Sequence, residues 1–61
     1  MYKLKEIRKS MGYTQLYMAK KLNISESYYS QLENGNRRMP LSIALKIAKV
    51  LNKSFEDIFL P

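Results

Sequence analysis

Signals that end helices recur at short intervals along this chain of 61 residues. Four residues that readily take the left-handed conformation of a helix end follow apolar stretches. They are Gly12, Asn23, Gly35 and Asn52. Hydroxyl residues suited to cap the next helix stand at Thr14, Ser25 and Ser54. The chain is therefore predicted to form several short helices, and no segment has the alternating pattern of a strand.

Apolar spacing within these intervals predicts five helices. Four are expected at about residues 2–11, 15–22, 26–34 and 41–51, and a short fifth follows the sequence "SFED", which is typical of a capping box. The inward faces of the first three helices are expected to hold Leu4, Ile7 and Met11, then Met18, Ala19 and Leu22, then Tyr29 and Leu32. Phe55, Ile58 and Phe59 supply the apolar side of the fifth.

The fourth segment is apolar on most sides, which indicates a helix at the centre of a small domain. Its main apolar face is expected to consist of Leu41, Ala44, Leu45, Ala48 and Leu51, with a second stripe of Ile43, Ile47 and Val50. Only "NIS" separates the second and third helices, so these two must cross sharply, and the small Ala19 allows their close approach. The prediction is one all-α domain over residues 1–61, with a helix-turn-helix at about 15–34.

Composition argues against an enzyme. The chain has no cysteine, no histidine and five carboxylates, so the usual general base and the commonest metal ligands are missing. No metal site, cofactor or small-molecule ligand is expected. The net charge of +6 favours a polyanionic partner, either nucleic acid or an anionic membrane. A membrane-surface binder would need one long helix with a basic face, which the repeated caps and glycine stops contradict, so no membrane partner is expected. No apolar run approaches the ~20 residues of a membrane span, and the charged N-terminus is unlike a signal peptide, so a cytoplasmic protein is expected.

Several motifs in order resemble one known family. They are "TQ" opening the second helix, "ISxS" opening the third, "ENG" closing it, and "LxxALKIAKxL" followed by "FEDIF". Together they resemble the Cro/lambda-repressor-like helix-turn-helix regulators, also called the xenobiotic-response-element family, from Leu4 to Phe59. The resemblance implies a compact five-helix bundle that binds specific double-stranded DNA sequences, usually as a dimer. The chain departs from the family at Leu16 and Tyr17, where acidic residues are common, and at Glu26, an acid on the DNA-facing helix.

In this family the third helix enters the major groove of DNA. The resemblance therefore implies base contacts from Glu26, Ser27, Tyr28, Ser30 and Gln31. Phosphate contacts are expected from Gln15, at a helix N-terminus, and from Asn34, Asn36, Arg37 and Arg38, in and before the following loop. Without the resemblance, the same residues would be interpreted as a solvated helix and turn. Lys46, Lys49 and Lys53 are interpreted as general positive field rather than contacts.

Arg8 lies beside the apolar face of the first helix, where a charge without a partner is costly. The resemblance pairs this position with Glu33. A structural ion pair is therefore expected, and a remaining donor of Arg8 could face a phosphate. In the alternative, Arg8 simply extends into water.

A homodimer is expected because a domain of this size has little core of its own. Relatives of this kind often pair through the C-terminal helix, so Phe55, Phe59 and Leu60 are expected in or beside the interface, although Phe55 and Phe59 may equally belong to the core. The leading hypothesis is a transcriptional repressor that binds a palindromic operator. The alternative is an antitoxin-like or adaptor module, with Leu16, Tyr17 and the stripe of Ile43, Ile47 and Val50 as its surface.

Overall fold

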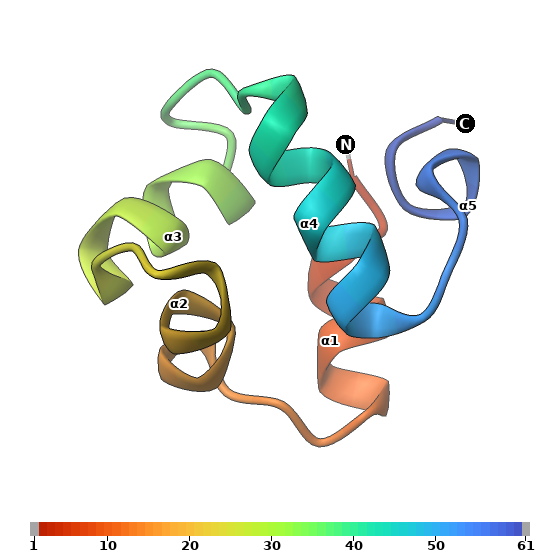
Figure 1. Ribbon diagram of the computed structural model, residues 1–61, viewed down its shortest axis with the longest axis horizontal. Helices are drawn as coiled ribbons and strands as arrows, with labels where there is room; N and C mark the ends of the chain where they lie inside the picture. The colour runs from red at the N-terminus through yellow and green to blue at the C-terminus, as the bar shows by residue number, and fades with distance from the viewer. Residues whose placement is uncertain (1, 61) are drawn as a thin grey trace.

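The computed structural model describes residues 2–60, and this part of the chain folds into five helices without a strand (Figure 1). The helices are α1 (Leu4–Ser10), α2 (Gln15–Leu22), α3 (Glu26–Glu33), α4 (Leu41–Leu51) and α5 (Phe55–Phe59). The all-α prediction is confirmed. The predicted bounds of α2 and α4 match, while α1 is shorter at both ends than expected and α3 ends one residue earlier.

Local signals place the helix ends. Left-handed residues follow α1 to α4, with φ angles of 76°, 59°, 80° and 55° at Gly12, Asn23, Gly35 and Asn52. After each helix, the amide of the left-handed residue and the next amide donate to carbonyls of the last turn, which is the Schellman arrangement. At the N-termini, the hydroxyls of Thr14, Ser25 and Ser54 accept hydrogen bonds from the amides three residues ahead, at 3.0, 3.0 and 3.1 Å.

The core forms where α2 packs against α3 and α4 and where α5 closes over α1 and α4. Figure 1 shows α4 in the middle of the molecule, with α3 and α5 toward opposite ends of the longest axis. Ala19 is 1% exposed, as expected for a small residue at a close helix crossing. The buried apolar residues are Leu4, Met18, Ala19, Leu22, Tyr29, Leu32, Ala44, Ile47, Ala48, Leu51 and Ile58.

The predicted inner face of α4 is partly wrong. Leu41 and Leu45 are 65% and 50% exposed, whereas Ile47, which was assigned to the second stripe, is fully buried. The face that packs inward runs through Ala44, Ile47, Ala48 and Leu51. Leu45 is turned by about 100° from Ala44, as adjacent helical residues are. Leu41 lies at the first position of α4, at the edge of the core.

Two further expectations change. Met11 follows the last residue of α1 and is 37% exposed, so it does not extend the inner face of that helix. Ile43 and Val50 are half-buried and pack against the core. The stripe of Ile43, Ile47 and Val50 is therefore not a free interaction surface, and the exposed apolar residues of α4 are Leu41 and Leu45.

Candidate nucleic-acid interface

The N-terminal half of α3 presents a polar side to solvent. Ser25 caps the helix, and this start directs Tyr29 and Leu32 into the core, where both are fully buried. Glu26 and Ser27 are exposed, and the other predicted base-contact residues are half-buried on the same outer side. These are Tyr28, Ser30 and Gln31. The structure thus places on one side of α3 all five residues that were predicted to meet DNA bases.

Weak contacts link neighbouring side chains on this surface. The Gln31 side-chain amide donates to the Ser27 hydroxyl at 3.4 Å, and Asn34 donates to Ser30 at the same distance. Both bonds are long, so either amide can exchange its partner for a base or a phosphate at little cost.

The loop after α3 is anchored to the helix that it follows. The backbone amides of Asn36 and Arg37 both donate to the carbonyl of Gln31, at 2.9 and 3.3 Å. The Arg37 guanidinium lies over the Tyr28 ring, 5.3 Å from its centroid. Asn34, Asn36, Arg37 and Arg38 are exposed, so the predicted phosphate-contact residues of this loop form a basic edge beside α3.

Gln15 opens α2 and is half-buried. The acidic residues that are common in the family at positions 16 and 17 are missing here. The helix α2 still has an N-terminal cap, because the Thr14 hydroxyl accepts a hydrogen bond from the amide of Tyr17. The first amides of a helix have no partner within that helix, so the start of α2 is suited to an anion.

Arg8 and Glu33 form a buried ion pair that joins α1 to α3. Arg8 Nε lies 2.8 Å from Glu33 Oε2, and Nη2 lies 3.0 Å from Oε1. The remaining nitrogen, Nη1, donates to the Tyr13 carbonyl at 2.7 Å. Arg8 is 6% exposed, so it does not extend into water. Each of the two Nη nitrogens carries a second N–H group besides those in these hydrogen bonds, so a phosphate contact from Arg8 stays a prediction.

The pair perturbs both ionisable groups. Burial by itself would raise the pKa of Glu33, but the hydrogen bonds and the charge of Arg8, together with the nearby polar side chains of Tyr29 and Gln15, outweigh burial and hold that pKa below its usual value. The carboxylate in turn raises the pKa of Arg8. Nearby, the Tyr29 hydroxyl is buried without a hydrogen-bond partner among the described residues, and burial raises the pKa of this phenol well above its usual range.

An aromatic pair at the start of α2, made by the half-buried Tyr13 before the helix and the exposed Tyr17 on it, was not predicted. The Tyr13 and Tyr17 rings lie 4.4 Å apart between centroids, and the Lys21 ammonium sits 5.6 Å from the Tyr17 ring. The neighbouring Tyr17 raises the pKa of Tyr13. Leu16 beside it is 45% exposed. The spacing of Tyr13, Tyr17 and Lys21 at four-residue steps is the signal that could have revealed the cluster.

The predicted dimer residues lie beside one apolar groove of about 260 Å³. Phe55 and Phe59 are half-buried, with ring centroids 5.1 Å apart, and Leu60 is 49% exposed. Phe59 also meets Tyr2 edge to face at 5.1 Å. Leu41 adds an exposed side chain from α4, and none of the residues 2–60 that line the groove is charged; we call it the apolar groove.

Within residues 2–60, no helix is both long and apolar enough to cross a membrane. The same part of the chain contains no group of three or more side chains placed to hold a metal ion.

Comparison with known proteins gives consistent matches over nearly the whole chain. A family model described as helix-turn-helix matches residues 4–58. Three similar relatives bear the name of uncharacterized HTH-type transcriptional regulators. A protein of Methanocaldococcus jannaschii is 40% identical over 58 residues, covering 95% of this chain and 88% of the relative. YazB of Bacillus subtilis is 39% identical over 59 residues, with 97% and 86% covered. A protein of Archaeoglobus fulgidus is 36% identical over 58 residues, with 95% and 83% covered.

Proposed function

Because this chain belongs to the Cro/C1-type helix-turn-helix family of DNA-binding transcriptional regulators, we propose that it is a repressor which binds a palindromic operator as a homodimer. The observation that carries the proposal is the outer side of α3, where Ser27 and Gln31 stand next to the basic loop of residues 36–38. We further propose that the protein acts in the cytoplasm, without a cofactor and without catalysis.

Base recognition is assigned to the outer side of α3, inserted in the major groove. Gln31 can form two hydrogen bonds with adenine, and Ser27 can donate to or accept from several bases. Glu26 can accept from the amino group of cytosine, but it would be repelled by a nearby phosphate. The long Ser27–Gln31 bond supports this assignment, since it leaves the Gln31 amide able to exchange the Ser27 hydroxyl for a base at little cost. Tyr28 and Ser30 complete the surface.

Phosphate binding is assigned to both sides of α3. Gln15 and the first amides of α2 serve one strand. Asn34, Asn36, Arg37 and Arg38 serve the other from the basic edge. Arg37 stacks on Tyr28, and its backbone is bonded to Gln31, so the phosphate-binding loop and the base-reading helix move as one unit.

Dimerisation is assigned to the apolar groove, with Leu41, Phe55, Phe59 and Leu60 facing the same residues of a second copy. A two-fold interface places like residues together, which suits a groove without charge. The Cα trace spans 26 Å along its longest axis, with α3 and α5 toward opposite ends (Figure 1). Pairing through α5 would therefore place the two α3 helices toward the outer ends of the dimer, where each could meet one of two half-sites about 34 Å apart.

Selection from random-sequence duplexes, followed by affinity measurements over a range of salt concentrations, tests the proposal. We expect a palindromic consensus. If a dimer neutralises about six phosphates, the slope of log affinity against log salt should be roughly −5. A slope near zero, or no enriched duplex, would contradict DNA binding. A consensus without symmetry would contradict the dimer alone.

The exposed Leu16 and Tyr17 favour a second candidate, an antitoxin-like or adaptor module that binds another protein. Isolated exposed leucines are common, so this observation alone has less weight than the surface of α3. A gel shift with the protein's own promoter distinguishes the two, since only the repressor retards that DNA at physiological salt.

A further inference from the structure

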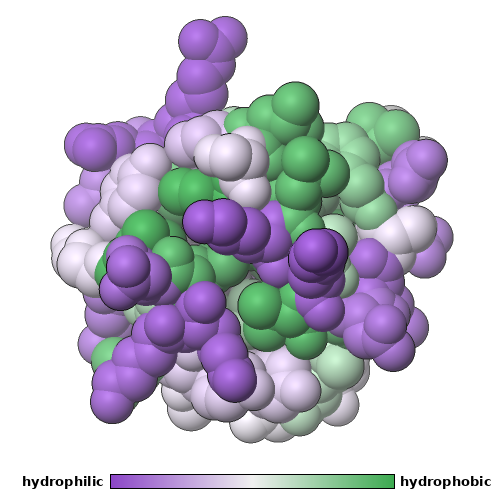
Figure 2. Space-filling model, in the orientation of Figure 1, coloured by the Kyte–Doolittle hydropathy of each residue, from purple (hydrophilic) through white to green (hydrophobic). Residues whose placement is uncertain are grey.

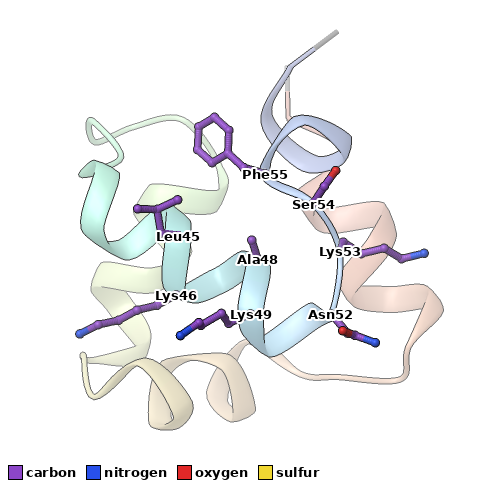
Figure 3. A pocket seen from close by; sticks show the side chains of 8 residues that line it. All are labelled: Leu45, Lys46, Ala48, Lys49, Asn52, Lys53, Ser54 and Phe55. Atoms are coloured by element: carbon purple, nitrogen blue, oxygen red, sulfur yellow. The ribbon is translucent and has the colours of Figure 1, made fainter.

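A second groove, of about 800 Å³, lies between α4 and its connection to α5 (Figure 3). Leu45, Ala48 and Phe55 supply its apolar floor. Lys46, Lys49 and Lys53 line the rim, with Lys46 and Lys49 extending to one side of Ala48 and Lys53 to the other (Figure 3). Phe55 separates this groove, which we call the lysine groove, from the apolar groove.

Within residues 2–60, no carboxylate side chain stands among the residues that line the lysine groove beside its three lysines. Among residues 2–60 the structure has one ion pair, Arg8–Glu33, so none of the rim lysines is paired within this part of the chain. The floor is not covered either, because Leu45 is 50% exposed. Figure 2, which views the face carrying α4, shows hydrophobic areas with hydrophilic side chains standing between them.

We propose that the lysine groove binds an acidic amphipathic helix of another protein. The apolar side of such a helix would cover Leu45, Ala48 and Phe55, in the way that amphipathic helices occupy apolar grooves. Its flanking carboxylates would meet the rim lysines, and this charge complementarity would select acidic helices over neutral or basic ones. The proposal adds a protein partner to the DNA-binding function and does not depend on it.

Two other occupants fit the groove less well. A second copy of this chain carries a net charge of +6, and a two-fold contact through this groove would place lysines against lysines. DNA could neutralise the lysines, but its phosphate backbone offers no apolar group to cover Leu45 and Phe55. The base-reading surface of α3 also lies toward the end of the molecule opposite α5 (Figure 1).

The first experiment is a selection of displayed random peptides of about 16 residues, roughly four helical turns, against the immobilised full chain. We expect enriched peptides to carry a net negative charge and apolar residues at helical spacing. The Lys46→Glu/Lys49→Glu variant should bind the best peptide at least about tenfold more weakly, because attraction becomes repulsion at two positions. The Lys5→Glu/Lys9→Glu variant has the same charge change on exposed positions of α1 and should lose less than about threefold, because distant exposed charges are screened by salt.

The second experiment requires no variant. In the wild-type chain labelled with ¹⁵N, the best peptide should shift the amide resonances of residues 45–55 and leave those of residues 26–31 unchanged. A random-sequence duplex should do the reverse. Enrichment of neutral or basic peptides, equal losses in the two charge variants, or peptide-induced shifts outside the groove would each overturn the proposal. Duplex-induced shifts centred on Leu45, Ala48 and Phe55 would overturn it in favour of DNA.

Discussion

Arg8 and Glu33 show how two single residues connect helices that are far apart in sequence. The pKa of Glu33 is lowered in the folded protein, so the folded state favours the charged carboxylate more than the unfolded state does. The stability that the pair contributes is therefore present above the ordinary carboxyl value of 4.5 and is lost as the pH falls through the lower folded value. The pair should not contribute to stability in strong acid.

We expect Glu33→Gln to lower the free energy of unfolding by about 3 kcal/mol near neutral pH, because Arg8 keeps its burial and loses its counter-charge. The difference from the wild type should shrink as the pH falls from about 5 to about 3. Urea denaturation across this range measures both effects. Glu6→Gln, at an exposed position of α1, is the control and should change little. A constant difference at all pH values would contradict the ion-pair account.

Tyr29 carries a buried hydroxyl without a partner among the described residues. Removing such a group without changing the shape of the ring relieves a desolvation penalty. Tyr29→Phe is therefore expected to raise the free energy of unfolding by about 1 kcal/mol. Thermal denaturation measures the change, with Tyr28→Phe on the outer side of α3 as the control. A clear loss of stability in Tyr29→Phe would mean that the hydroxyl is hydrogen-bonded in solution.

At the scale of helices, the ends depend on single left-handed residues. Gly12 has a φ of 76°, and no atom beyond Gly12 and its two chain neighbours lies within 4 Å of where its Cβ would be, so the backbone angle and not crowding favours glycine there. Gly12→Ala should lower the free energy of unfolding by about 1 kcal/mol, and Gly12→Asn by less, since asparagine tolerates this conformation. Asn23→Gly should keep or raise stability. If Gly12→Ala left the free energy of unfolding unchanged, the left-handed glycine after α1 would not contribute to stability.

Mutations of α3 and of the loop that follows it should distinguish residues that read bases from residues that bind phosphates. Gln31→Ala is expected to cost about 1–3 kcal/mol on the preferred site and to relax specificity. Arg37→Ala should weaken binding to all duplexes alike and flatten the salt slope by about one unit. Lys5→Ala removes the same charge from α1 and serves as the control in fluorescence anisotropy titrations. Equal losses from Gln31→Ala and Arg37→Ala on every duplex would contradict these roles.

At the scale of the whole molecule, the apolar groove predicts the state of assembly. Analytical ultracentrifugation of the wild type at micromolar concentration should show a dimer, and Leu60→Glu should shift it to a monomer. Leu16→Glu is a matched control, because Leu16 and Leu60 are 45% and 49% exposed but lie on different elements. A wild-type monomer that binds one half-site as tightly as a palindrome would exclude the two-fold arrangement.

The sequence by itself determined the division of this chain into helices. Caps at Thr14, Ser25 and Ser54 and left-handed residues such as Gly12 and Asn23 act through hydrogen bonds to amides and carbonyls a few residues away. Such signals are complete within a short segment, so they can be recognised without a fold. The order of motifs then indicated the family, and with it the side of α3 that we propose faces DNA and the pairing of Arg8 with Glu33, which lie 25 residues apart.

Only the tertiary structure decided which apolar residues remained outside. The periodicity of α4 allowed Leu41, Leu45 and Ile47 to be inner or outer, because its apolar residues surround most of the helix. Burial depends on where α2 and α5 cross α4, and this information is not contained in the pattern of one helix. The same crossings left Leu45 exposed between Lys46, Lys49 and Lys53 and placed Leu41 beside Leu60. Both grooves are products of packing, since each combines residues of α4 with residues near α5.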